Sequence, residues 1–307
     1  MALLALLLLF SLCASAQTAP PGLPIIDVHM HAESQDPRFG STLTSPLTGR
    51  QVTAPANEAE HRAECLALMR RFNVVKAVVS SDHHDAVLRW KQGAPEKVLI
   101  GYAFLDPAKV DLDFLRKEHA AGRLDVLGEV APEYEGYAPN DPRLEPFFAL
   151  AEELDIPIAL HMHPGPWGAP YPPFNMPKMR AGNGRPLLLE EVLVRHPKLR
   201  IYIMHAGWPF LDELKALLYS HPQVYVDVGV IDWTQPRPEF HRYLRGLVEA
   251  GHGQRILFGS DQMVWPEAIG LAIEGVESAD FLTAEQKRDI FCRNAARFLR
   301  LDPKTCE

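Results

Sequence analysis

Cysteine is scarce in this chain, with four residues among 307, and no two of them form a Cys-x-x-Cys pair. Three of them follow residue 16, namely Cys65, Cys292 and Cys306. This number of thiols is too small for a dense disulfide framework. The fold must therefore be stabilised by a hydrophobic core. A single disulfide and a set of free thiols both remain open, and the sequence does not say which pair would join.

Basic residues are also in the minority. The chain has 31 Lys and Arg against 39 Asp and Glu, which gives a formal net charge of −8 without any basic run. A net acidic surface repels the nucleic-acid backbone, so we expect no nucleic-acid partner. Low-complexity segments, charge blocks and linkers are absent after the N-terminal stretch. The hydrophobic content of 47% is enough for a large core.

The N-terminal stretch MALLALLLLFSLCASA, residues 1–16, is almost wholly apolar and ends in the small residues Ala14-Ser15-Ala16. This pattern predicts a secretory signal peptide cleaved after Ala16, although no Lys or Arg precedes it. The run is too short to cross a bilayer as a helix, so we expect no stable membrane insertion. The mature protein is therefore expected to be exported, periplasmic or secreted, with a short tail at 17–23.

Short apolar runs rich in β-forming residues alternate along the rest of the chain with amphipathic stretches. The predicted strands are 24–31, 74–81, 98–105, 125–132, 156–163, 200–207, 224–230 and 255–261. Their near-continuous apolar character is typical of parallel strands covered on both faces. The alternation predicts one α/β domain at 24–302, a distorted (β/α)8 TIM barrel, with a tail at 303–307. A doubly wound sheet is the alternative, but the first strand lacks a glycine-rich dinucleotide turn.

Helix-like stretches separate these strands. They include 57–72, 141–154, 185–196, 210–221, 266–276 and 283–299. The first opens with Asn57, an N-cap candidate with Glu60 three residues later. Long irregular loops follow strands one and five, at 32–56 and 164–185, and in a barrel both lie at the C-terminal face, where active sites form. The second is rich in Pro, Gly and aromatics, which predicts an ordered cap over a cleft.

Polar side chains close several predicted strands. They are His29 and His31 on the first, Glu129 on the fourth, His161 and His163 on the fifth, His205 on the sixth and Asp261 on the eighth. Because side chains alternate along a strand, His29 and His31 project to the same face. If that face is the barrel interior, these groups converge at its mouth.

Imidazole and carboxylate groups are the ligands that a zinc-like divalent ion prefers, and a catalytic site leaves a position open for water. That water becomes a nucleophile near neutral pH, and Asp261 can act as its general base. Each residue alone has a plainer explanation. A lone histidine is more often hydrogen-bonded in the core, Glu129 can pair with a basic side chain, and Asp261 can cap a helix. Their joint position at one end of separate strands favours a metal site.

The segments DVHMH, GEV, IALHMH, IMHAGWP, LFGSD and NAARFL resemble, in this order, the amidohydrolase superfamily. The similarity is to its amidohydrolase-related branch of metal-dependent hydrolases and decarboxylases, and it runs across nearly the whole mature chain. It implies a distorted (β/α)8 barrel that holds one or two divalent metals, often zinc. Many members carry a carboxylated lysine on strand four. Because this chain has Glu129 instead, we expect one metal and leave a bridged pair open.

By this resemblance, the metal ligands are His29, His31, His161 and Asp261, with Glu129 as a further candidate. The resemblance also implies that Asp261 shuttles protons, and that His205 polarises the substrate, takes part in acid–base chemistry or binds a second metal. Asp27 shares the alternation of His29, so we expect it to orient a ligand imidazole.

Four residues at the end of strand five or in the loop after it are candidate substrate contacts: His163, Trp167, Tyr171 and Arg180. Packing within the loop is the plainer explanation for the aromatics, and a solvated surface position is the plainer one for Arg180. His83 and His84 follow strand two at the same barrel end and are outside candidates.

The first functional hypothesis is a hydrolase that uses metal-activated water to cleave an amide, ester or lactone bond of a small molecule. The alternative on the same site is a non-oxidative decarboxylase of an aromatic or unsaturated acid. A third hypothesis, from a different class, is a non-catalytic metal-binding barrel. Homo-oligomerisation remains open.

Overall fold

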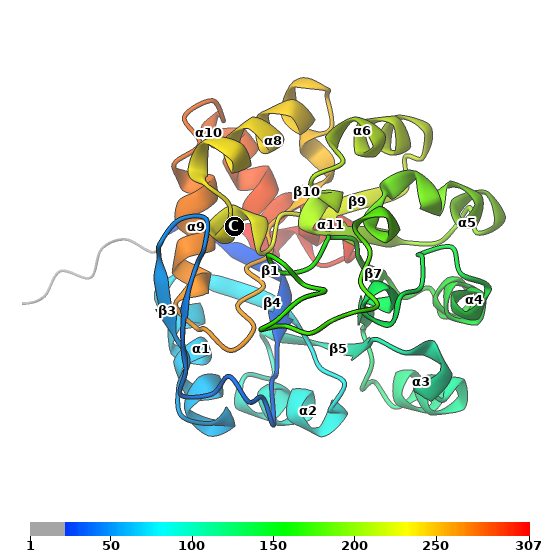
Figure 1. Cartoon of the computed structure of the whole chain (residues 1–307), viewed down its shortest axis with the longest axis horizontal. Coiled ribbons are helices and arrows are strands. Elements are labelled where there is room, and N and C mark those ends of the chain that lie inside the picture. The colour runs from blue at the N-terminus through cyan, green and yellow to red at the C-terminus, as the bar shows by residue number, and fades with distance from the viewer. Residues whose placement is uncertain (1–21) are drawn as a thin grey trace, which may run out of the picture.

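The computed structural model describes residues 22–307, so the predicted signal peptide lies outside the described residues. Eight parallel strands form a barrel (Figure 1). In order they are β1 (Ile25–His31), β4 (Val74–Ser80), β5 (Val98–Phe104), β6 (Val126–Val130), β7 (Ile158–His161), β8 (Ile201–Met204), β9 (Val224–Asp227) and β10 (Ile256–Leu257). The Val28 and Asp261 N–H groups donate to the Phe258 and His29 carbonyls and close the barrel between its last and first strands. The predicted TIM barrel is confirmed.

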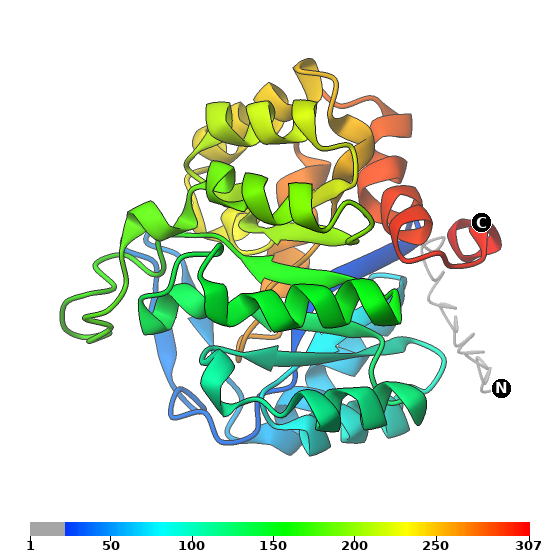
Figure 2. The ribbon, with the colours of Figure 1, turned by 90° about the vertical axis from the view of Figure 1, so that its right-hand side faces the viewer.

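Helices cover the outside of the barrel (Figures 1 and 2). They are α1 (Glu58–Arg71), α2 (His84–Gly93), α3 (Leu112–Ala120), α4 (Glu145–Leu154), α5 (Glu190–Arg195), α6 (Leu211–Ser220), α7 (Ile231–Thr234), α8 (Arg237–Glu249), α9 (Ala268–Glu277), α10 (Ala284–Arg288) and α11 (Asn294–Phe298). Asn57 caps α1 as predicted, because its Oδ1 accepts the Glu60 N–H at 3.1 Å. The predicted stretches did not include α2, α3, α7 and α8.

Two hydrophobic clusters hold the strands from opposite sides. The outer cluster packs strand residues such as Met30 and Leu127 against the helices. The inner cluster fills the lower barrel with residues such as Ile26, Val28 and Val126, and the side chains of α11 close it from below. The interior is therefore a packed core up to the level at which polar side chains take over.

Register shifts in β1 and β6 change which face of the strand the last side chains project from. Ile26 and Val28 face the inner cluster, so strict alternation would turn His29 outward. A register shift between Asp27 and Met30 resets the alternation. A second shift between Leu127 and Val130 does the same for Glu129. As a result the histidines and the glutamate face the barrel axis above an apolar floor.

The two long loops differ from each other. The loop at 32–56 contains a hairpin, β2 (Thr42–Thr44) with β3 (Gln51–Thr53). The loop at 164–185 has only a short 3-10 turn at Ala181–Gly184, and Figure 2 shows its middle extending away from the barrel. Several strands also end earlier than predicted, β10 at Leu257 instead of 261, because the chain turns aside at the mouth.

A disulfide joins Cys292 to Cys306, with 5.8 Å between their Cα atoms, and ties the C-terminal 3-10 turn to the helices below the barrel. Cys65 is a free, buried thiol. Among residues 22–307, no helix is both long and apolar enough to span a membrane.

Candidate metal centre

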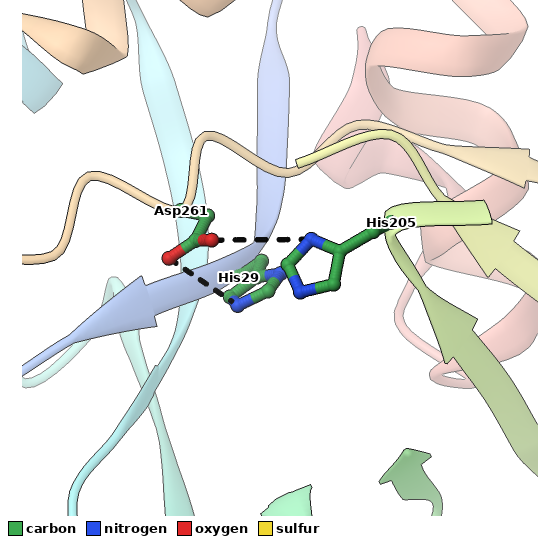
Figure 3. A group of neighbouring side chains, drawn as sticks. All are labelled: His29, His205 and Asp261. Carbon is green, nitrogen blue, oxygen red and sulfur yellow. Dashed lines mark ion pairs between the residues drawn. The ribbon is translucent and has the colours of Figure 1, made fainter. Parts of the chain in front are cut away.

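The carboxyl ends of five barrel strands bring polar side chains to one point. His29 and His31 lie on β1, Glu129 on β6 and His161 on β7, while His205 follows β8 and Asp261 follows β10. These side chains are buried, with exposed fractions between 1% and 14%. Figure 3 shows the Asp261 carboxylate facing the neighbouring imidazoles of His29 and His205. Its Oδ1 lies 3.6 Å from His29 Nε2, and its Oδ2 lies 3.9 Å from His205 Nδ1.

Glu129 divides this cluster into two groups. Its Oε2 lies 3.4 Å from His31 Nε2 and 3.9 Å from His29 Nε2. Its Oε1 lies 3.7 Å from His161 Nε2 and 3.8 Å from His205 Nε2. We call His29, His31 and Asp261 the β1 group, and His161 with His205 the β7–β8 group. Each oxygen of one carboxylate therefore faces a different set of imidazoles.

Hydrogen bonds at Nδ1 fix the tautomers of the ligand histidines. His29 Nδ1 lies 3.1 Å from Asp227 Oδ2, and His205 Nδ1 lies 2.9 Å from the Gly229 carbonyl. His161 Nδ1 bonds to Glu133 Oε1. Because a carbonyl and two carboxylates accept, each Nδ1 carries the proton. The Nε2 lone pairs are therefore left pointing into the cluster, as a metal ligand requires.

Several inward-facing atoms lack a hydrogen-bond partner among the described residues. They are the Nε2 atoms of His29, His31 and His205 and Oδ1 of Asp261, all of them buried. His31 Nε2 and Asp261 Oδ1 lie 3.0 Å apart and can bond to each other only when this nitrogen carries a proton. Each unpaired buried polar atom lowers the stability of the fold by about 1–3 kcal/mol. A bound group that accepts electron pairs from these atoms would remove this cost. A divalent ion with nitrogen and oxygen ligands fits this donor set.

Electrostatics favour positive charge at the same place. Burial lowers the pKa of His29, but the charges of Asp261 and Asp227 raise it well above its usual range. Burial raises the pKa of Asp261, but the positive charges of His29 and His31 bring it below its usual range. The Asp261 carboxylate therefore stays ionised and presents a negative potential to a bound cation.

Backbone strain accompanies two of these side chains. His205 and Asp261 have φ angles of 57° and 45°, in the left-handed region. This conformation costs a non-glycine residue about 1–3 kcal/mol. Their N–H groups donate to Asp227 Oδ1 and the His29 carbonyl, at 3.0 and 2.8 Å. The rest of the site thus holds both residues in the orientation that turns them inward.

The amidohydrolase family model, Amidohydro_2, matches residues 26–301. The chain belongs to the amidohydrolase family. Among curated proteins, protein fluG of Emericella nidulans is 25% identical to this amidohydrolase over 133 residues. That match covers 38% of this chain and spans only 15% of the length of fluG.

Solved structures share the fold of this amidohydrolase at low identity. A 2,6-dihydroxybenzoate decarboxylase from Rhizobium is 16% identical, with a TM-score of 0.60 over 92% of this chain and 99% of that one. A probable 2-pyrone-4,6-dicarboxylic acid hydrolase from Acinetobacter baumannii, with citric acid bound, is 17% identical, with a TM-score of 0.59 over 91% and 100%. A 5-carboxyvanillate decarboxylase from Novosphingobium aromaticivorans, complexed with manganese, is 13% identical, with a TM-score of 0.60 over 91% and 97%. Such identities establish the fold alone.

The candidate substrate contacts of this amidohydrolase lie in different places. His163 is buried beside the cluster, and burial together with nearby His205 and His161 holds its pKa well below the usual range. Trp167 and Tyr171 are 68% and 69% exposed on the loop. Arg180 donates to the Pro177 and Met179 carbonyls of that loop. The structure thus brings only His163 to the cluster.

The histidines after β4 lie outside the cluster. His83 and His84 line a separate pocket of about 770 Å³ between the loops after β1 and β4 and helix α3. His84 Nε2 bonds there to Glu118 Oε2 at 3.0 Å.

Sequence reasoning missed the carboxylates that orient the imidazoles. Asp227 ends β9 inside the apolar run VYVDVGV, and a charged residue in so apolar a strand was the available signal. Glu133, which bonds to His161, lies just past β6. The expectation for Asp27 was wrong, because its Oδ1 accepts the backbone N–H groups of His29 and Ser260. The register shift after Asp27 breaks the alternation on which that expectation rested.

Proposed function

We propose that this amidohydrolase is a hydrolase that works with two divalent ions, one at each oxygen of Glu129. The β1 group and Glu129 Oε2 would hold the first ion, and the β7–β8 group and Glu129 Oε1 the second. The observation that carries this proposal is that Nε2 atoms without hydrogen-bond partners among the described residues lie on both sides of a single carboxylate. Those of His29 and His31 lie near Glu129 Oε2, and that of His205 lies near Glu129 Oε1. This differs from the single ion expected from the sequence, because Glu129 lies between two ligand sets.

A divalent ion in this position supplies Lewis acidity and lowers the pKa of a bound water toward neutrality. The remaining tasks fall to side chains. Asp261 Oδ1 lies 3.0 Å from His31 Nε2 at the centre of the cluster, and this ionised carboxylate can take a proton from the nucleophile and return it to the leaving group. Tyr134, whose hydroxyl lies 3.5 Å from His161 Nε2, can donate to a substrate oxygen at the same place.

For the substrate we propose a small molecule with an amide, ester or lactone bond. The buried ligand set supports water attack on a polarised carbonyl, which is common to all three bonds. Zinc suits nitrogen and carboxylate ligands, and manganese is the metal in one structural neighbour. We therefore propose zinc, with manganese as the competing ion.

A second candidate function is non-oxidative decarboxylation of an aromatic acid. It is favoured by the names of two structural neighbours, which are decarboxylases of the same fold. In this case Asp261 would move a proton to the substrate carbon instead of activating water.

The test is a substrate screen on protein expressed without its first 16 residues and loaded with zinc or manganese. The panel contains amides, esters, lactones and aromatic acids, with release of acid and of carbon dioxide measured separately. We expect hydrolysis that depends on metal and is lost in Asp261→Asn. The matched control is Asp125→Asn, which changes a carboxylate at the start of β6, the opposite end from the cluster, that accepts the Ile100 N–H at 2.7 Å. Carbon dioxide release without hydrolysis would support the second candidate, and metal binding without turnover would favour the non-catalytic barrel.

We also propose that the protein is exported. The disulfide between Cys292 and Cys306 supports an oxidising compartment, where such bonds persist. Expression of the full chain in a bacterium, followed by mass analysis of the periplasm and medium, should give a mature protein that begins at Gln17. Full-length protein confined to the cytoplasm would contradict the proposal.

A further inference from the structure

His163 is a buried imidazole next to the metal centre that belongs to neither ligand group. It lies two residues after His161, just beyond β7, and is 8% exposed. Its ring is stacked on Trp208, with 5.5 Å between centroids and 28° between planes. On another side the ring meets that of His205, with 5.2 Å between centroids. His163 therefore lies directly beside the β7–β8 group.

The loop after β7 determines which nitrogen of His163 is protonated. The Gly165 N–H donates to His163 Nδ1 at 3.2 Å, so Nδ1 supplies a lone pair. In the neutral ring the proton must then lie on Nε2. His163 forms no ion pair with any carboxylate among residues 22–307, so the structure offers no contact that would favour a second ring proton. This is the opposite arrangement to His29, His161 and His205, whose protons lie on Nδ1.

Among residues 22–307, the Nε2–H group of His163 has no hydrogen-bond partner, and packing holds the ring that carries it. His163 Nε2 is buried and has no hydrogen-bond partner among the described residues. The stacking on Trp208 and the hydrogen bond from the Gly165 N–H to Nδ1 hold the ring in this orientation. Nδ1 is taken by the loop, and the neighbours of the ring on the side of the metal centre are the imidazoles of His205 and His161, with centroids 5.2 and 6.1 Å away. A buried, unpaired N–H is costly, and an acceptor oxygen of a ligand would satisfy it.

We propose that His163 is a catalytic residue that donates a hydrogen bond from Nε2 to an oxygen of the bound substrate. The acceptor class is a carbonyl or carboxylate oxygen next to the bond that breaks, where negative charge grows during reaction. A fixed neutral donor aimed at that oxygen stabilises the charge without any proton transfer. The catalytic part of this inference rests on the proposed function, whereas the tautomer and the binding of an oxygen acceptor do not.

Three substitutions separate the donor from the other contacts of the ring. His163→Gln keeps an N–H donor at about the reach of Nε2. His163→Asn keeps an acceptor near the place of Nδ1 for the Gly165 N–H but has no donor that extends into the site. His163→Phe keeps only the stacking on Trp208. If His163 only packs against Trp208, the Phe variant should be the least affected in ligand binding and activity. If His163 donates a hydrogen bond, the Gln variant should be the least affected.

The first measurement needs no turnover. Protein labelled with 15N-histidine is observed by NMR, and the His163 signals are assigned by their loss in His163→Gln. We expect an Nε2–H tautomer in the free protein and a shift of its Nε2 and proton signals when acetate binds to the metal-loaded protein. An Nδ1–H tautomer, or a signal that acetate leaves unchanged, would overturn the proposal even if a variant failed to fold.

The second measurement compares the variants, with bound metal determined for each. For acetate binding we expect His163→Gln to stay close to the natural protein, and the Asn and Phe variants to bind about 10-fold more weakly. With a substrate from the screen, kcat/KM should fall about 10- to 100-fold in the Asn and Phe variants and be partly restored in Gln. Equal acetate affinity in all variants would refute the donor role. If no substrate is turned over while the tautomer and acetate results hold, the proposed function fails and the binding role of His163 stands.

Discussion

Replacing Asp227 by asparagine should weaken metal binding while leaving the barrel folded. Asp227 is fully buried at the end of β9. Its Oδ2 accepts from His29 Nδ1 at 3.1 Å, and its Oδ1 accepts from the N–H groups of His205 and Gly229 at 3.0 and 2.9 Å. One carboxylate thus orients a ligand from the β1 group and the backbone of a ligand from the β7–β8 group.

An asparagine of nearly the same shape cannot satisfy all three donors. If its oxygen keeps the two backbone N–H groups, its NH2 group faces His29 Nδ1 and forces the ring proton to Nε2, which removes the ligand lone pair. If the amide turns over, the NH2 group faces the two backbone donors. Either conflict costs about 1–3 kcal/mol. The expected loss is about 10- to 100-fold in metal affinity, which is also the typical effect of losing a group that orients a ligand.

The assay is competition for zinc against a chelator of known affinity at fixed pH, with circular dichroism to check the fold. Asp125→Asn serves as the control, because the asparagine oxygen can still accept the Ile100 N–H that Asp125 accepts. The reasoning is refuted if Asp227→Asn binds zinc as tightly as Asp125→Asn does.

Three further predictions concern stability. Burial lowers the pKa of His61 from 6.5 to about 4, so the unfolded chain binds the proton more readily and stability is lost as pH falls through this window. With a chelator present to remove metal, protonation of His61 in the unfolded chain should lower the free energy of unfolding, measured by urea titration, by about 2 kcal/mol between pH 7 and pH 5. An equal drop in His61→Gln would contradict this. The disulfide joins residues 14 positions apart, so Cys306→Ser should lower the free energy of unfolding by about 3 kcal/mol. An unchanged free energy of unfolding after reduction of the disulfide in the natural protein would contradict this estimate. Removal of metal by a chelator should lower the unfolding midpoint by on the order of 10 °C, and zinc should restore it, because a ligand that binds only the folded state stabilises it; an unchanged midpoint would argue against a tightly bound ion.

The barrel and the set of polar residues could be predicted because both are local patterns. Apolar runs separated by amphipathic stretches specify the strands of an α/β fold, and the eight barrel strands lie where those runs are. The order of His29, Glu129, His161, His205 and Asp261 along the chain places each at the carboxyl end of a strand. Parallel strands then bring them together whatever the details of the loops.

What could not be predicted depends on small irregularities and on long-range partners. Strict alternation from Ile26 does not foresee the register shift that turns His29 inward, and Asp27 was misjudged for this reason. Asp227 meets His29 across 198 positions of sequence, so no local pattern pairs them. The division of the cluster by Glu129 is likewise a matter of side-chain orientation. These features decide how many ions the site holds and which tautomers its histidines adopt.

The most direct test of the central claim is anomalous diffraction from crystals of the metal-loaded protein at the zinc and manganese absorption edges. We expect two peaks, one between Glu129 Oε2 and the β1 group and one between Glu129 Oε1 and the β7–β8 group. A site with no peak, or a single ion that leaves one oxygen of Glu129 without a metal, would contradict the two-ion site.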